Sequence, residues 1–287
     1  MKKILRIFTI ICITLILSGC LKTDTFEGIE IYTTTYPIEY ITYRLYGNHS
    51  TIKSIYPDGI NVDKYKLTSK QIKDYSSSNL FIFNGLTNEK DYVAKMFKHN
   101  KKLKIIDTTS SMEIINHTEE LWLDPSNFLM LTQNIRIGFK EYISNHYLSE
   151  EVDKNYEELK IEISNLDAKL KTMADSANNN TIVVSSDLFK FLEKYNLNVI
   201  SLEENENLTE KTVSDVINLI KNRKINYIFI KQNEEVNKTI KKIQNETNVK
   251  LLEINTLTNI NEEERNNKQN YITIMNDNIE TIKQELY

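Results

Sequence analysis

The chain has 287 residues, of which 36 are basic and 40 acidic, for a formal charge of −4 at pH 7. The acidic balance and the scattered lysines provide no positive footprint for a polyanion, which argues against nucleic acid as a partner. Without a signal peptide of 19 residues, which carries three basic groups and no acidic one, the charge becomes −7 and about 268 residues remain. That length suffices for two domains of ordinary size or one large one.

Residues 1–19 have the pattern of a signal peptide, with basic residues followed by an apolar run over residues 7–17. This run is shorter than the roughly 20 residues that a membrane-spanning helix needs. The stretch Leu-Ser-Gly-Cys that ends at Cys20 reads as a bacterial lipobox, which predicts a lipid on the Cys20 sulfur and a tether over residues 20–28. The alternative is an ordinary secretory peptide with an incidental cysteine. The predicted location is the extracellular face of the cell membrane.

Strand and helix patterns alternate over residues 29–107, within a predicted first lobe of residues 29–147. Buried strands are expected because short apolar and β-branched runs stand between turn residues, and helices because apolar residues recur every three or four positions. The predicted strands are 29–34, 50–56, 79–85 and 102–107, and the predicted helices are 36–47, 68–78 and 89–100. This order is typical of a mostly parallel sheet with helices on its faces.

A single apolar stripe recurs every three or four residues over 148–177, without Gly or Pro, and predicts one long helix. A helix of roughly 30 residues is about 45 Å long, so it could join two lobes. A coiled-coil arm is the alternative.

A second series of strands and helices follows over residues 178–287, the predicted second lobe, and ends in an amphipathic helix. The predicted fold is therefore α/β, with two lobes of mostly parallel sheet joined by one long rigid linking helix. Ligands of such sheets bind at the carboxyl ends of the strands, which predicts a site in a cleft between the lobes.

The order and spacing of several segments resemble the bacterial solute-binding lipoproteins of cluster A-I, which bind Zn²⁺ or Mn²⁺ for ABC importers. The likeness covers nearly all of the mature chain. It rests on the lipobox, the long helix, the terminal helix and the segments TTTYPIEYITYRLYG, YPDGINVDKYKLTSKQI, NLFIFNGL, LWLDPSN, SSDLFKFLEKYNLNVISL and INYIFIK. The resemblance implies an ABC permease as partner and a membrane attachment through the N-terminal lipid.

In that family four side chains, mostly histidines and carboxylates, close on one cation from both lobes. Counting from Gly59 places Asp63 at the first ligand position, and Glu120 stands at the second, just ahead of the Leu-Trp-Leu-Asp-Pro stretch. Ser186 occupies the third position, at a strand-to-helix turn, and Asn255 or a neighbour the fourth. All four differ from the residues that the resemblance leads us to expect.

These oxygen donors suit Mn²⁺, Mg²⁺ or Ca²⁺ better than zinc. The resulting prediction is a divalent metal cation, with Mn²⁺ favoured over Zn²⁺ and water completing the shell. His117, three residues before Glu120, is an alternative ligand. The chain contains no His-x-x-x-His, His-Glu-x-x-His or paired-cysteine motif that would indicate a compact zinc site.

Each candidate residue also has a purely structural interpretation. Asp63 could cap a turn before the helix that follows, and Glu120 could pair with a lysine or face solvent. Ser186 could be a helix N-cap, as Asp124 is expected to be ahead of Pro125. Asn255 could simply end a strand.

The predicted function is a membrane-anchored solute-binding lipoprotein of an ABC importer that binds a divalent cation in the cleft. No phosphate-binding glycine loop and no nucleophile motif points to an enzyme. The alternative is a family member that has lost metal binding and captures another small ligand or a protein partner, including an adhesin-like role at the surface.

Overall fold

The computed structural model describes residues 26–113 and 120–287. The signal-peptide and Cys20 lipidation predictions, and the alternative ligand His117, fall on residues outside these ranges. Among the described residues, no helix is both long enough and apolar enough to cross a membrane.

The first lobe is built on one parallel sheet whose strand order is β2-β1-β3-β4. Strand β3, one of its two central strands, buries all four of its residues, because helices cover both faces of the sheet. The strands are β1 (Ile29–Thr33), β2 (Ser50–Ser54), β3 (Leu80–Phe83) and β4 (Lys104–Asp107), and the helices are α2 (Tyr36–Tyr46), α3 (Ser69–Tyr75) and α4 (Lys90–His99). These elements match the predicted series.

A proline and a glycine mark the two ends of α2. Pro37 stands in the first turn of the helix, and Gly47 is its C-cap. The φ of Gly47 is −59°, a right-handed helical value, so this glycine does not adopt the left-handed conformation common at helix ends and leads into a short 3-10 helix, Gly47–His49.

The second lobe repeats the strand order of the first, as β6-β5-β7-β8, again fully parallel. Its strands are β5 (Thr181–Val184), β6 (Asn198–Ser201), β7 (Tyr227–Lys231) and β8 (Lys250–Ile254). The helical elements are the 3-10 helix η4 (Asp187–Tyr195), α7 (Glu210–Lys221), α8 (Lys238–Thr247), α9 (Glu262–Asn266) and α10 (Tyr271–Leu286). The predicted fold class of two α/β lobes is confirmed, whereas α9 was not predicted.

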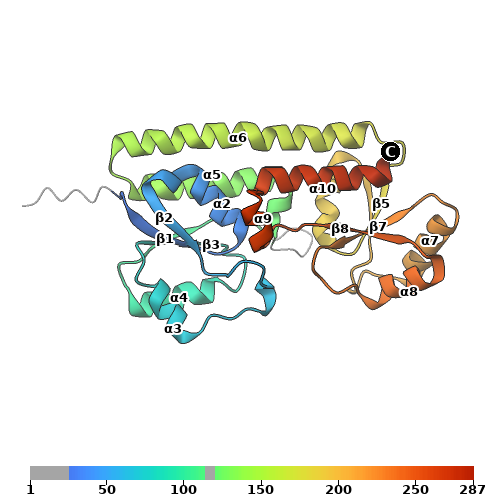
Figure 1. The fold of residues 1–287 in the computed structure, drawn as a ribbon, viewed down its shortest axis with the longest axis horizontal. Coiled ribbons are helices and arrows are strands. Elements are labelled where there is room, and N and C mark those ends of the chain that lie inside the picture. Colours follow the sequence, from blue (N-terminus) through green and yellow to red (C-terminus); the bar gives the residue numbers. More distant parts are fainter. Residues whose placement is uncertain (1–25, 114–119) are drawn as a thin grey trace, which may run out of the picture.

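The long helix α6 (His146–Asp175) joins the two lobes and runs along one side of both (Figure 1). It packs against α2 and α5 (Pro125–Tyr142) of the first lobe and against α10 of the second. Its apolar stripe is buried along the whole length, from Leu148 to Met173, within one core that includes residues of both sheets. The coiled-coil alternative is therefore wrong, because the stripe packs inside this molecule.

Candidate functional site

A polar pocket of about 170 Å³ lies where the two halves of the chain meet, at the carboxyl ends of β7 and β8. We call it the central pocket. The first half contributes residues 59–63 and Glu120, and the second half contributes residues 231–234 together with Asn255, Thr256 and residues 258–261 and 264. This is the position at which parallel α/β sheets bind ligands.

Glu120 is placed by the tryptophan stretch that follows it. Leu121, Trp122 and Leu123 form a buried 3-10 turn. The Trp122 indole Nε1–H donates to the carbonyl of Thr256 over 2.7 Å, and the Tyr271 hydroxyl donates to the Trp122 carbonyl over 2.5 Å. These two bonds hold the tryptophan stretch against the second lobe. Glu120, the residue before it, therefore lies at the central pocket.

Several charged groups act on the Glu120 carboxylate. Burial raises the pKa of Glu120 above its ordinary value, while the Thr258 hydroxyl, which donates to its Oε1 over 2.5 Å, and the Lys231 ammonium act in the opposite direction. The charges of Asp63 and Glu234 raise the pKa further. The pocket therefore holds a desolvated carboxylate among other carboxylates, an arrangement that a bound cation would relieve.

Asp63 lies in a short 3-10 turn, Val62–Lys64, on the first-lobe side of the pocket, and its side chain is exposed. The capping role considered for it is wrong. Asn61 caps this turn by accepting from the Lys64 amide over 3.1 Å, and Thr68 caps α3 through a capping box. Asp63 performs neither task.

Asn255 directly follows β8 and is fixed by hydrogen bonds of both its backbone and its side chain. Its backbone N–H donates to Asn278 Oδ1 over 3.0 Å, its Nδ2 donates to Glu264 Oε1 over 2.8 Å, and its Oδ1 accepts from the Leu257 amide over 2.8 Å. A carbonyl oxygen has a second lone pair, so Oδ1 can still accept from or ligate a group in the pocket.

Ser186 does not line the central pocket. Its hydroxyl accepts from the Leu188 amide over 3.3 Å as the N-cap of η4 and donates to Glu203 Oε2 over 3.0 Å, in a neighbouring hollow. The N-cap interpretation is confirmed, as it is for Asp124 at the start of α5. The structure thus brings Asp63, Glu120 and Asn255 together and leaves Ser186 outside.

Five ionisable or hydroxyl residues of the described pocket lining were not predicted from the sequence: Lys231, Glu234, Thr256, Thr258 and Glu264. Lys231 ends β7, so the strand-end rule could have found it. Its Nζ pairs with Glu234 Oε2 at 2.8 Å. Thr258 carries no local signal, because its bond to Glu120 spans 138 residues of sequence. Glu264 belongs to a capping box with Asn261, a local pattern, but that pattern by itself indicates a helix start and not a pocket.

Among the residues that the structure describes, the ionisable lining of the pocket is four carboxylates, Asp63, Glu120, Glu234 and Glu264, against one ammonium, that of Lys231. In the part of the chain that the structure describes, no three His, Cys, Asp or Glu side chains gather as a ready-made metal site. The pocket offers acidic charge together with amide and hydroxyl oxygens.

Comparisons with known proteins agree with this architecture. The family model described as "Zinc-uptake complex component A periplasmic" matches residues 31–285. The "Metal ABC transporter substrate-binding lipoprotein" of Lactococcus lactis is 26% identical over 244 residues, which cover 77% of each chain. The "Iron-binding protein YfeA" of Yersinia pestis is 24% identical over 204 residues, which are 66% of this chain and 65% of that relative's own length.

Solved structures share the fold at low sequence identity. The Zn(II)-bound ZnuA-like domain of AdcA from Streptococcus pneumoniae has a TM-score of 0.73 and 21% identity, with 90% of this chain and 99% of that one covered. The laminin-binding protein Lbp of Streptococcus pyogenes has a TM-score of 0.73 and 15% identity, with 91% and 100% covered. Because the family model spans most of the chain, this protein belongs to the family of zinc-uptake complex component A, the metal-binding periplasmic substrate-binding proteins of ABC transport, which are not enzymes.

Proposed function

We propose that this protein is a lipid-anchored solute-binding protein that takes up a divalent cation in the central pocket and delivers it to an ABC permease. Cys20 would carry the lipid, which would hold the protein at the extracellular face of the membrane. Asp63 and Glu120 would be the charged ligands, with Asn255 and water as further oxygen donors. The proposal rests on one observation: the Glu120 carboxylate is desolvated among other carboxylates in a pocket that both halves of the chain line.

The chemistry of the lining indicates which cation fits. Two carboxylates neutralise a divalent ion, and amide, hydroxyl and water oxygens suit a hard cation. Imidazole and thiolate, which favour zinc, are missing from the described lining. We therefore expect the central pocket to favour Mn²⁺ over Zn²⁺, unlike a histidine-based site.

Lys231 adds a constraint on this site. Its ammonium already stabilises the pocket through Glu234 and through the charge of Glu120. A divalent cation that enters the pocket must compete with this ammonium, either by displacing the side chain or by tolerating its repulsion. This competition should weaken cation binding, because the ammonium already neutralises part of the negative charge of the lining carboxylates.

Calorimetric titration of the metal-free protein with Mn²⁺, Zn²⁺ and Ca²⁺ tests the proposal. We expect one site, and we expect the Asp63→Asn, Glu120→Gln double variant to lose it. Ser186→Ala is the matched control, because Ser186 lies outside the central pocket, and it should keep full affinity. Tight Zn²⁺ binding that survives in the double variant would contradict the proposed ligands.

A second candidate function is the capture of a small organic solute. The pairing of the Lys231 ammonium with carboxylates across one pocket favours a ligand that carries both an acidic and a basic group. In that case the titrations with metal would give no heat, whereas a panel of small zwitterions would raise the melting temperature and Lys231→Gln would abolish the effect.

A further inference from the structure

We propose that Arg265 is a latch between the two lobes, which positions the loop of residues 57–64 at the mouth of the central pocket and thereby slows release of the bound solute. The loop contains Asp63, so the inference about release rests on the proposed function. The inference about the loop itself does not.

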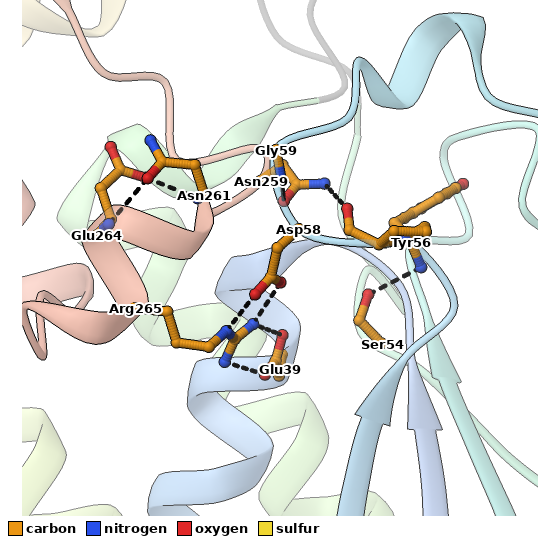
Figure 2. Close-up of polar contacts among 10 residues, drawn as sticks. Glu39, Ser54, Tyr56, Asp58, Gly59, Asn259, Asn261, Glu264 and Arg265 are labelled. Atoms are coloured by element: carbon orange, nitrogen blue, oxygen red, sulfur yellow. Dashed lines mark hydrogen bonds and ion pairs between the residues drawn. The ribbon is translucent and has the colours of Figure 1, made fainter.

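The Arg265 guanidinium makes paired contacts with two carboxylates (Figure 2). Its Nε and Nη2 donate to Asp58 Oδ2 and Oδ1 over 2.6 and 2.8 Å. Its Nη1 and Nη2 donate to Glu39 Oε1 and Oε2 over 2.9 and 3.2 Å. Such forked, charge-assisted pairs are both stronger and more directional than single hydrogen bonds.

The three partners come from three distant elements. Glu39 lies in the first turn of α2, Asp58 lies in the turn that follows β2, and Arg265 lies in α9. The contacts therefore span 226 and 207 residues of sequence and connect the first lobe to the segment that follows the last strand of the second. None of the α9 residues is buried, whereas Ile260, two residues before the helix, lies in the shared core. Ile260 therefore anchors the approach to α9, and polar contacts hold the helix itself.

Backbone contacts extend the latch along the loop. The Gly59 amide donates to the Ile260 carbonyl over 2.9 Å, and Asn259 Nδ2 donates to the Pro57 carbonyl over 2.9 Å. Gly59 has a φ of +74°, a conformation that costs glycine little and other residues more. The loop therefore lies along residues 259–260 of the second lobe, and Asp63 follows four residues later.

The same short helix also touches the pocket wall. Glu264, the residue before Arg265, forms a capping box with Asn261 and accepts from Asn255 Nδ2 over 2.8 Å. Arg265 of α9 thus binds the first-lobe loop, and its neighbour Glu264 binds the pocket residue Asn255. A shift of α9 would alter both walls of the pocket together.

The charges make the latch depend on the arginine. One guanidinium stands between two carboxylates, so Arg265→Gln leaves Asp58 and Glu39 facing each other without a counter-ion. Asp58→Asn removes one carboxylate and leaves the Glu39 pair intact. We therefore expect the arginine variant to loosen the loop more than the aspartate variant, and we expect the Arg265→Gln, Asp58→Asn double variant to be partly rescued.

Hydrogen exchange measured by mass spectrometry on the full chain tests the loop. In Arg265→Gln we expect the hydrogen-exchange rate over residues 57–64 to rise, because the loop loses its charge-assisted pair. The rise should be about tenfold and no larger, because the pair is half-exposed and solvent partly screens it. The exchange rate in Arg265→Lys should lie between those of the parent and Arg265→Gln, because an ammonium cannot form the two forks. Arg44→Gln is the matched control: Arg44 also forms a fork, with Glu162 of α6, but it does not join the lobes. Unchanged exchange in Arg265→Gln, or an equal rise in Arg44→Gln, would overturn the latch.

Release is then measured by chasing bound Mn²⁺ with excess chelator. We expect Arg265→Gln to release Mn²⁺ about tenfold faster while Arg44→Gln does not. A looser loop with an unchanged release rate would overturn the link between the latch and release. If the parent protein binds no Mn²⁺, the proposed function fails, whereas the exchange result still decides whether the latch exists.

Discussion

Glu89→Gln should remove a large part of the pH dependence of stability. The Glu89 side chain is buried at the start of α4, with 4% of its surface exposed. Its Oε2 accepts from the Asn84 amide over 2.9 Å and its Oε1 accepts from the Tyr56 hydroxyl over 3.3 Å. Burial raises the pKa of this carboxyl to about 7 from an ordinary 4.5, although its hydrogen-bond partners act in the opposite direction.

The sign and size follow from proton linkage. The folded protein holds this proton more tightly than the unfolded chain, so the contribution to the free energy of unfolding is complete below pH 4.5 and is lost as the pH rises through about 7. The difference between the two pKa values corresponds to a change of about 3 kcal/mol in the free energy of unfolding. Glutamine has no proton to lose, so its contribution to the free energy of unfolding does not change with pH.

Urea unfolding from pH 4 to pH 8.5 measures the effect. The free energy of unfolding of the parent minus that of Glu89→Gln should fall by about 3 kcal/mol across this range, with the midpoint of the change between the two pKa values. A difference that stays constant with pH, or that rises, would refute the reasoning that a desolvated carboxyl at Glu89 is protonated in the folded state.

Three further substitutions test other parts of the structure. Lys231→Gln removes the ammonium beside Glu234, so the affinity for Mn²⁺ should rise about fivefold in calorimetric titration, whereas a loss of affinity would show that the lysine itself holds the ligand. Gly138→Ala places a methyl group 2.5 Å from the Ile106 side chain, so the free energy of unfolding should fall by about 1–3 kcal/mol; an unchanged value would mean that α5 can move away from β4. Leu166→Ala in α6, 1% exposed, should cost about 2–5 kcal/mol by the same urea assay, because it opens a cavity in the core that both lobes share.

The layer architecture could be predicted from sequence because its signals are local. Strand β3 is a short apolar run between polar residues, and the stripe of α6 repeats at helical spacing for its full length. Helix α9 escaped prediction because it has only five residues and none is buried, so no apolar pattern marks it. Its end-capping residue Asn261 is one of many asparagines in this chain and gives little warning of its role.

The candidate site could be predicted only in part, for a physical reason. Glu120 and Asn255 are placed by neighbouring sequence features, the tryptophan stretch and the end of a strand. Ser186 has an equally good local signal, but its hydroxyl is used by a helix N-terminus and by Glu203. Arg265 has no local signal at all, since its partners lie more than 200 residues away.

The metal content of the protein as isolated tests the central claim most directly. The full chain would be purified from membranes without chelator and its bound metals counted by mass spectrometry, beside the Asp63→Asn, Glu120→Gln double variant and the control Ser186→Ala. The account predicts one equivalent of divalent metal, most of it manganese, in the parent and in the control. It predicts none in the double variant. A parent protein without metal, or a double variant that keeps it, would contradict the account.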